Sequence, residues 1–269
     1  HIHMPVETLQ FPRPKRGEVL VKNAAAGVCH TDLHIILNHI PFPKPAVVGH
    51  EISGEVAELG EGYLGDLRVG DPVVGTFIMP CGHCPACSTN NEDICETFFQ
   101  NNRLRGGLLD GTTRLFRRSE EQIAMYSMAG FAEYSVVPER AVYRLPSELP
   151  KLESAIVGCA LFTAYGAAKN AAGMRGGEDV VVFGVGGVGG NLVQVCRAFG
   201  ANKIIAVDRS QEKLDYAKER MGATHGVLAD GDGSTPGQDV VEQVLSITGG
   251  RGAHIAFEVI GRSETVRQA

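Results

Sequence analysis

Short apolar runs separated by glycine and proline dominate the first half of the chain, whereas the second half alternates apolar runs with amphipathic stretches. Between residue 15 and about residue 150, the runs 18–22, 52–57 and 71–75 are each bounded by turn residues. This pattern predicts a compact β-rich domain. Residues 96–127 are polar and rich in arginine, with weak periodicity, so we expect a long surface loop there.

From residue 160 the pattern predicts helices in regular alternation with strands. We expect helices over 160–172, 188–198, 212–221 and 239–247, and strands over 178–183, 203–207, 226–228 and 254–258. The valine-rich strand 178–183 has the composition of a strand buried on both faces. The repeating β-α order indicates an α/β fold with a doubly wound parallel sheet, and we expect the two domains to span residues 1–158 and 159–269.

Composition narrows the class of protein. The 269 residues carry a formal charge of -6 and a pI near 5.9, which argues against a nucleic-acid partner or an acidic membrane surface. No apolar run reaches the roughly 18 to 20 residues that span a bilayer. The N-terminal residues lack the basic and apolar segments of a signal peptide. We therefore expect a cytoplasmic protein, in which clustered cysteines bind metal more often than they form disulfides.

Four of the seven cysteines lie in one polar segment, at positions that suit a closed metal site. Two-residue gaps allow consecutive sulfurs to turn toward one centre, and a short loop brings the fourth. The alternatives are disulfides, which the cytosolic character disfavours, and a nucleic-acid-binding zinc ribbon, which the lack of local basic residues disfavours. We expect a structural zinc bound by Cys81, Cys84, Cys87 and Cys95.

A glycine-rich turn between the strand ending at residue 183 and the following helix has the spacing GxGxxG. A lone GxGxxG is weak evidence, but here an acidic residue, Asp208, ends the next strand. The glycines allow pyrophosphate to approach the backbone at a helix N-terminus, and Asp208 can accept hydrogen bonds from ribose hydroxyls. The carboxylate favours NAD over NADP, although the adjacent Arg209 weakens that preference. The turn residues expected at the cofactor are Gly184, Gly186, Gly187, Val188 and Gly189.

The remaining cysteines occur beside histidines, in GVCHTDLH around Cys29, in GHE around His50 and in GC at Cys159. Each motif alone is explained by a cysteine packed in the core or by a loop histidine whose hydrogen bonds are satisfied. Cys196 is best explained as a core residue. Two thiolates and one imidazole nevertheless make the Cys₂His set that leaves a zinc position open for water or substrate.

These motifs, together with GCALFTAYGA and VFGVGGVGG, occur in the order found in zinc-dependent medium-chain alcohol dehydrogenases. The sequence resembles that family from about residue 6 to its last residue, and the segment 105–114 resembles its long-insert, liver-type branch. The resemblance implies a GroES-like catalytic domain followed by a Rossmann cofactor domain. Family members are longer at both ends, so we expect a chain that is incomplete at both ends, with an incomplete cofactor domain.

The resemblance also implies roles for individual residues. Cys29, His50 and Cys159 would bind a catalytic zinc, so that two Zn²⁺ are expected per chain. Glu51 would approach the metal during ligand exchange, and Asp32 would orient the imidazole of His50. The remaining positions carried over are Thr31 and His34 as a proton relay through the cofactor ribose, His30, Thr163, Val188 and Lys213 near the cofactor, and Phe77 in the substrate pocket. The local sequence explains Thr31 equally well as a helix N-cap.

The activity implied is hydride transfer between a primary or aromatic alcohol, or the aldehyde in reverse, and NAD, with zinc polarising the alcohol oxygen. A thiol-dependent formaldehyde dehydrogenase stays open, although Ile40 stands where the glutathione-dependent branch commonly has an acid. The arginines at 103, 105 and 114 suit an anionic substrate, but we favour a solvated loop for them. The alternative outside the class of enzymes is a non-catalytic scaffold that binds a nucleotide. A homodimer or homotetramer is expected by analogy alone.

Overall fold

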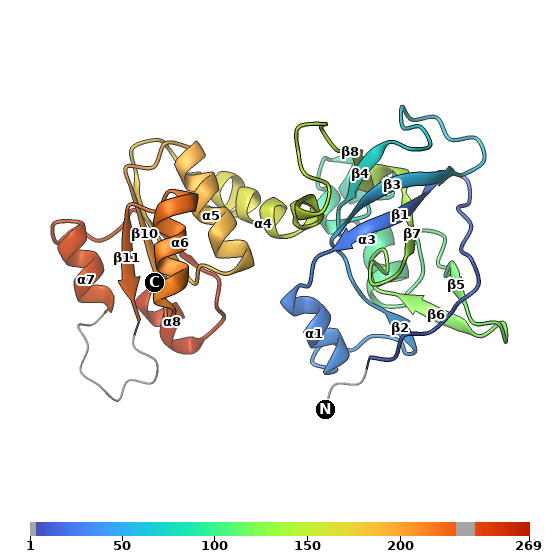
Figure 1. Ribbon diagram of the computed structural model, residues 1–269, viewed down its shortest axis with the longest axis horizontal. Helices are drawn as coiled ribbons and strands as arrows, with labels where there is room; N and C mark the ends of the chain where they lie inside the picture. The colour runs from blue at the N-terminus through green and yellow to red at the C-terminus, as the bar shows by residue number, and fades with distance from the viewer. Residues whose placement is uncertain (1–3, 230–239) are drawn as a thin grey trace. The chain divides into compact units, whose positions relative to one another are not determined.

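The computed structural model describes residues 4–229 and 240–269 and divides into two compact units (Figure 1). The first unit spans His1–Cys159 and the second spans Ala160–Ala269. Cys159 thus belongs to the first unit, one residue beyond the boundary expected from the sequence. Residue 239, the predicted start of a helix, lies outside the described residues.

The first unit is built on a five-stranded antiparallel sheet in the order β7-β1-β3-β4-β8 and on a small sheet in the order β2-β6-β5. Short strands bounded by turns form these sheets, as the apolar pattern predicted. The strands are β1 (Glu18–Ala26), β2 (Ala46–Val47), β3 (Ile52–Leu59), β4 (Pro72–Gly75), β5 (Leu115–Phe116), β6 (Gln122–Met125), β7 (Tyr134–Pro138) and β8 (Val142–Arg144). The helices are α1 (His30–Ile36), α2 (Pro85–Ser88) and α3 (Glu96–Phe98), and α3 continues as a π-helical turn over Phe99–Arg103.

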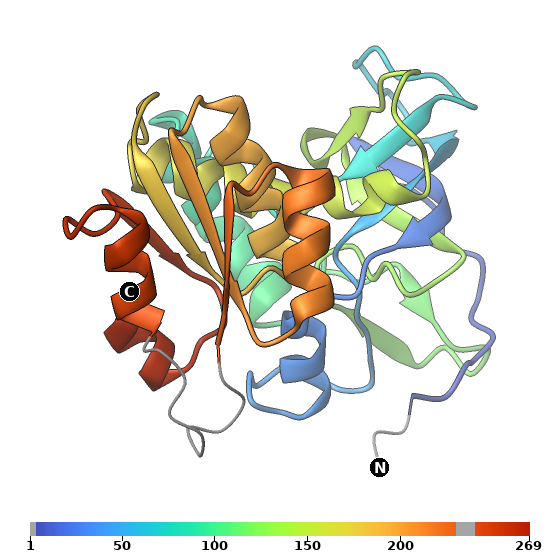
Figure 2. The same cartoon turned by 60° about the vertical axis from the view of Figure 1, so that its left-hand side comes forward.

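The second unit contains a parallel sheet in the order β11-β10-β9-β12, which is the 3-2-1-4 order of a Rossmann fold (Figure 2). Its strands are β9 (Asp179–Phe183), β10 (Lys203–Asp208), β11 (His225–Leu228) and β12 (Ile255–Glu258). Its helices are α4 (Ala160–Gly166), α5 (Gly187–Ala198), α6 (Gln211–Tyr216), α7 (Val240–Ile247) and α8 (Ser263–Gln268). Across the described residues of both units, every helix is too short or too polar to traverse a bilayer.

Both faces of the central strand β9 are buried, which confirms the prediction made from its valine-rich sequence. Val180 and Val182 point into one apolar cluster, which also contains Leu192 of α5. Val181 and Phe183 point into a second cluster on the opposite face, together with Val244 of α7. Alternate side chains of one strand therefore hold helices on both faces of the sheet.

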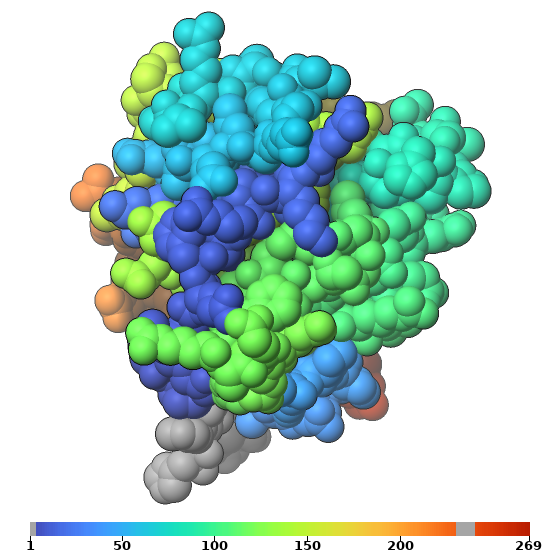
Figure 3. All heavy atoms as spheres, turned by 90° about the vertical axis from the view of Figure 1, so that its right-hand side faces the viewer, coloured from blue at the N-terminus to red at the C-terminus, as the bar shows by residue number. Residues whose placement is uncertain are grey.

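The prediction of a surface loop over residues 96–127 is wrong. Apolar side chains of this segment, among them Leu108, Leu115 and Met125, are buried in the core of the first unit. The fully buried Asn102 holds the segment in place, because its amide nitrogen lies 2.8–3.1 Å from the carbonyl oxygens of residues 107, 125 and 127. In Figure 3 the segment, in green, lies on the face of the molecule between the N-terminal residues in dark blue and the residues near position 90 in teal.

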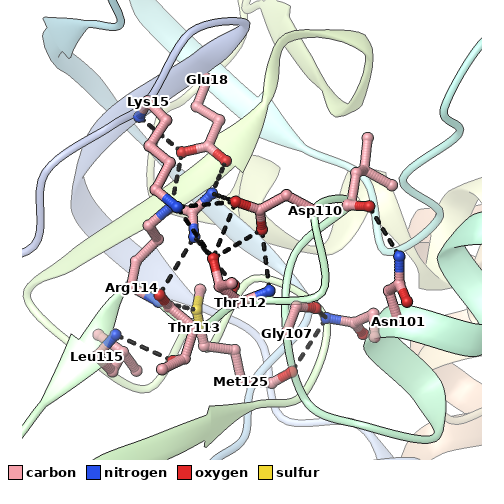
Figure 4. Close-up of polar contacts among 12 residues, drawn as sticks. Lys15, Glu18, Asn101, Gly107, Asp110, Thr112, Thr113, Arg114, Leu115 and Met125 are labelled. Carbon is pink, nitrogen blue, oxygen red and sulfur yellow. Dashed lines mark hydrogen bonds and ion pairs between the residues drawn. The ribbon is translucent and has the colours of Figure 1, made fainter.

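A buried ion pair joins this segment to the first strand of the sheet (Figure 4). Arg114 is 5% exposed and donates to the Glu18 carboxylate from Nε at 2.9 Å and from Nη2 at 2.5 Å. The same guanidinium contacts Asp110 at 3.0 Å, and Asp110 also binds Lys15. The expectation of a solvated loop is therefore wrong for Arg114, since its buried guanidinium is paired with the buried Glu18 carboxylate and with the more exposed Asp110.

We predict that Arg114→Met destabilises the protein by about 3–5 kcal/mol, because it leaves the buried Glu18 carboxylate without its partner. Urea unfolding followed by circular dichroism measures the change. Arg117→Met is the control, since Arg117 pairs with Glu7 and Glu121 at the solvent-exposed surface and a screened pair contributes little. The double variant Glu18→Met/Arg114→Met should recover much of the loss. Equal effects of Arg114→Met and Arg117→Met would contradict the assignment.

Candidate active site and metal centres

The start of helix α1 positions two residues of the candidate site. Cys29 occupies the N-cap position, and its backbone N–H donates to the Asp32 carboxylate at 3.2 Å. Thr31 is the second residue of the helix, so the N-cap alternative for Thr31 is wrong. Its hydroxyl oxygen lies 3.7 Å from the Cys29 sulfur. The contact between Cys29 and Asp32 therefore stabilises the start of the helix. The same turn places the Cys29 thiol close to the Thr31 hydroxyl.

Asp32 also fixes the orientation of His50. Its carboxylate is 1% exposed and accepts the Nδ1–H of His50 at 3.0 Å and the backbone N–H of Gly49 at 2.9 Å. Because the carboxylate only accepts, Nδ1 carries the proton and Nε2 is left to bind another group. This is the arrangement in which an acid holds a metal-binding histidine in one tautomer.

Four predicted site residues come together although they are far apart in the sequence. One ligand atom from each of Cys29, His50, Glu51 and Cys159 lies within 4.8 Å of the other three. Cys159 follows a 3₁₀ turn that approaches strand β4 closely, and a Cβ at Gly158 would lie 1.9 Å from the Gly75 carbonyl oxygen. A glycine before Cys159 is therefore required to bring that thiol to the cluster.

The groups of this cluster shift each other's pKa values. A hydrogen bond from Cys159 lowers the pKa of Cys29, and the same hydrogen bond together with burial raises the pKa of Cys159. Burial opposes the protonation of His50, but hydrogen bonds to Asp32 and Cys29 outweigh it and raise the pKa to about 9. Burial raises the pKa of Glu51. At neutral pH the cluster thus holds protons that a bound cation would displace.

The donor set and its packing fit a zinc ion. Two sulfurs and one imidazole nitrogen match the three protein ligands of a catalytic zinc, which keeps one position open. Cys159, His50 and Glu51 are buried, and Cys29 is half-buried. Glu51, which was predicted to approach the metal during ligand exchange, lies next to the three candidate ligands. Cys29, His50 and Cys159 would hold the metal, with Glu51 beside them.

The four-cysteine segment forms a second cluster, and its thiols are free of disulfides. The sulfur atoms of Cys84 and Cys95 are 3.8 Å apart, and those of Cys81 and Cys87 are 4.0 Å apart. Sulfurs bound tetrahedrally at about 2.3 Å from zinc lie about 3.8 Å from one another. Backbone N–H groups donate to two of the sulfurs, which stabilises thiolates. Cys196 lies apart, fully buried in α5, and is the core residue that the sequence predicted.

Two imidazoles of helix α1 and one from the residues after it form a row of rings. The ring centroids of His30 and His34 are 4.7 Å apart, and those of His34 and His39 are 5.4 Å apart. Nδ1 of His34 lies 3.2 Å from Nδ1 of His39, so one ring donates a proton that the other accepts. His39 was not predicted from the sequence. The only available signal was its position five residues after His34.

Two aromatic rings lie beside His50, and a guanidinium packs against the same two rings. The predicted pocket residue Phe77 lies 6.1 Å from the His50 ring, and Tyr126 lies 5.8 Å from it. The Arg103 Cζ lies 4.4 Å from the Tyr126 ring centroid and 5.7 Å from that of Phe77. The expectation of a solvated side chain is therefore wrong for Arg103, whereas Arg105 is exposed as expected. Tyr126 was missed, because nothing in its sequence surroundings separates it from an ordinary core aromatic.

In the second unit the glycine-rich turn joins β9 to α5, as predicted. Gly184 has a left-handed backbone (φ +88°), and α5 begins at Gly187. A Cβ at Gly189 would lie 1.7 Å from the Gly184 carbonyl oxygen, whereas a Cβ at Gly186 would meet nothing within 4 Å. Gly189 is thus required for packing of the turn against the helix, and the space beside Gly186 and Gly187 is open to a ligand.

Asp208 lies at the end of β10 and faces this turn. Its carboxylate accepts the backbone N–H of Val185 at 3.0 Å and that of Ser210 at 3.0 Å. A cavity of about 740 Å³ is lined by Val185 of the turn, by Ser210 and by residues of α6 and the turn that follows it, namely Glu212, Lys213, Asp215, Tyr216 and Glu219. Of the other predicted cofactor residues, Arg209 follows directly and is exposed, Val188 lies in the first turn of α5, and Thr163 is exposed on α4.

Two family descriptions match the chain. Residues 15–147 match the alcohol dehydrogenase GroES-like domain, and residues 187–269 match the zinc-binding dehydrogenase family. Together the two matches cover most of both units, and they agree with the antiparallel sheets of the first unit and the parallel sheet of the second.

Solved structures with similar sequences indicate the same family. An alcohol dehydrogenase zinc-binding domain protein from Burkholderia ambifaria is 36% identical, with a TM-score of 0.84 over 96% of this chain and 67% of its own. Benzyl alcohol dehydrogenase from Acinetobacter calcoaceticus is 33% identical, with a TM-score of 0.83 over 97% of this chain and 68% of its own. Alcohol dehydrogenase TADH from Thermus sp. ATN1 is 30% identical, with a TM-score of 0.72 over 99% of this chain and 69% of its own.

The chain spans about two thirds of the length of each of these proteins. Within that length it carries the GroES-like unit, the Rossmann-like unit and two clusters of potential metal ligands in one sequence. It therefore belongs to the zinc-type medium-chain alcohol dehydrogenase family of oxidoreductases.

Proposed function

We propose that the protein is an NAD-dependent alcohol dehydrogenase that oxidises primary or aromatic alcohols at the Cys29–His50–Cys159 cluster. The observation that carries this proposal is the buried Asp32 carboxylate, which holds His50 in the one tautomer that presents Nε2 to two thiols. A carboxylate that accepts the other ring N–H is typical of metal-binding histidines. When bound, zinc supplies Lewis-acid polarisation of an alcohol oxygen, and NAD accepts a hydride.

The residues of the first unit would position the alcohol and remove its proton. The Thr31 hydroxyl, next to the Cys29 sulfur, is placed to hydrogen-bond an alcohol held at the cluster. His34 lies three residues further along α1, and hence on the same face of the helix. The His34–His39 pair can hold one proton between two ring nitrogens and exchange it with solvent. These three side chains form our candidate route for the proton.

The residues of the second unit would bind the nucleotide. Backbone N–H groups at the start of α5 and the open space beside Gly186 suit a pyrophosphate. The Asp208 carboxylate suits a ribose with two free hydroxyls and would repel a 2′-phosphate, which favours NAD over NADP. The proposed cytoplasmic location and oligomeric state stay predictions from the sequence.

We predict that two variants of the glycine-rich turn separate folding from nucleotide binding. Gly186→Ala should leave thermal stability nearly unchanged but weaken NAD binding at least tenfold, because its methyl group enters the open space. Gly189→Ala should lower the melting temperature, because its Cβ collides with the Gly184 carbonyl oxygen. Calorimetric titration with NAD and thermal unfolding measure both effects. Unchanged NAD affinity in Gly186→Ala would argue against nucleotide binding at this turn.

We predict that Asp32→Asn weakens zinc binding at the Cys29–His50–Cys159 cluster by about 10- to 100-fold. The measurement is competition with a chelator near pH 9, because protons compete with the metal for His50 below its pKa of about 9. Asp66→Asn is the control, since the side chain of Asp66 is 91% exposed. In the wild type, zinc affinity should rise as pH rises toward 9. Equal affinities of Asp32→Asn and the wild type would contradict the role given to Asp32.

The proposed function is tested by zinc content together with NADH formation. We predict two zinc ions per chain in the wild type and in Cys196→Ser, one in Cys29→Ser, and loss of activity in Cys29→Ser alone. Ethanol, benzyl alcohol and formaldehyde, with and without glutathione or mycothiol, serve as substrates. Activity that strictly needs a thiol would identify a thiol-dependent formaldehyde dehydrogenase instead. A single zinc in both the wild type and Cys29→Ser, without activity, would identify a nucleotide-binding scaffold.

A further inference from the structure

A largely apolar cavity of about 460 Å³ opens in the first unit next to the rings that lie beside His50. Phe77 and Phe98 line its wall, and the Arg103 side chain reaches into it from the π-helical turn that follows α3. Two carboxylates, Asp93 and Glu96, also line the cavity, but both residues are exposed and hence screened by water. Among the residues that line the cavity, which also include the buried Cys95, Arg103 carries the one positive charge.

The Arg103 guanidinium is stacked among three aromatic rings. Its Cζ lies 4.4 Å from the ring centroid of Tyr126, 4.9 Å from that of Phe98 and 5.7 Å from that of Phe77. Its Nη1 is buried and has no hydrogen-bond partner among the described residues. No described carboxylate lies within ion-pair distance of it, in contrast to Arg114, which contacts two.

A buried charge without a counter-ion is costly, and stacking on aromatic rings offsets only part of that cost. Tyr126 also hydrogen-bonds the guanidinium, but Nη1 is left for a partner that a ligand would supply. A guanidinium presents parallel N–H donors that match the two oxygens of a carboxylate. The unpartnered Nη1 thus indicates a carboxylate ligand.

The same rings connect Arg103 to the candidate active site. Phe77 and Tyr126 each pack against the His50 ring and also against the Arg103 guanidinium. Phe77 thus lines the cavity and also contacts the His50 ring, so that one aromatic ring separates a ligand in this cavity from the candidate metal-binding residues. Flat apolar molecules with a carboxylate at one end match these features.

We propose that Arg103 is a specificity-determining residue that binds the carboxylate of a hydroxymethyl-substituted aromatic or unsaturated acid, with the alcohol group directed toward His50. This inference rests on the proposed alcohol dehydrogenase function. It adds a charged recognition group to a pocket that would otherwise select by shape and apolar contact.

Steady-state kinetics with a matched pair of substrates tests the proposal. In the wild type, kcat/KM should be higher for 4-(hydroxymethyl)benzoate than for 4-(hydroxymethyl)benzamide, which has the same shape without the charge. Arg103→Met should lower kcat/KM for the benzoate about 10- to 100-fold and change that for the benzamide less than threefold. Arg103→Lys, which keeps the charge without the paired donors, should fall between the two. The exposed Arg105→Met is the control and should leave both values unchanged.

Binding of 4-methylbenzoate, which cannot be oxidised, separates this proposal from the proposed function. Calorimetric titration of the zinc-loaded protein should give an affinity at least tenfold lower in Arg103→Met than in the wild type and in Arg105→Met. If the wild type does not oxidise alcohols but still binds 4-methylbenzoate more tightly than Arg103→Met does, the enzyme assignment is refuted and the carboxylate site is not. Equal binding to the wild type and Arg103→Met, or no binding to either, would overturn the carboxylate site. Thermal unfolding of each variant checks the fold, and Arg103→Lys serves if Arg103→Met does not fold.

Discussion

The buried carboxylate of Asp32 is the group on which the arrangement of the candidate site depends. It accepts hydrogen bonds from the backbone of Cys29, from the backbone of Gly49 and from the imidazole of His50. One side chain thereby ties the start of α1 to the segment before β3 and sets the tautomer of a potential metal ligand. A charge at this depth is tolerated because three donors replace the water that it lost.

The two units use different means to bring distant residues together. In the second unit, the alternation of apolar side chains along β9 places helices on both faces, so the glycine-rich turn and Asp208 meet at the carboxyl ends of adjacent strands. In the first unit, buried polar contacts perform this task. Asn102 and Arg114 satisfy their polar atoms inside the protein and fasten a mostly polar segment to the sheet.

This difference explains which features the sequence could predict. The fold of the second unit could be predicted from the periodicity of apolar residues and the glycine spacing, because short, regular elements determine its contacts. The candidate zinc ligands were predicted from cysteine spacing and from the family resemblance, and the structure brings them together. The burial of residues 96–127 was not predictable from polarity, because partners such as Glu18 lie about a hundred residues away. The place of Arg103 depends on a single π-helical turn, which leaves no periodic signal in the sequence.

The pairing of β1 with both β3 and β7 has a consequence for synthesis of the chain. Residues 18–22 hydrogen-bond with residues 134–138, and Glu18 pairs with Arg114, so the first sheet cannot close until strands β7 and β8 have left the ribosome. Cys159, the last residue of the unit, then completes the cluster begun by Cys29. Until that point the growing chain presents Cys29 without the thiol that lies beside it in the folded unit. The second unit, whose paired strands β9, β10 and β11 follow one another along the chain, can assemble as it emerges.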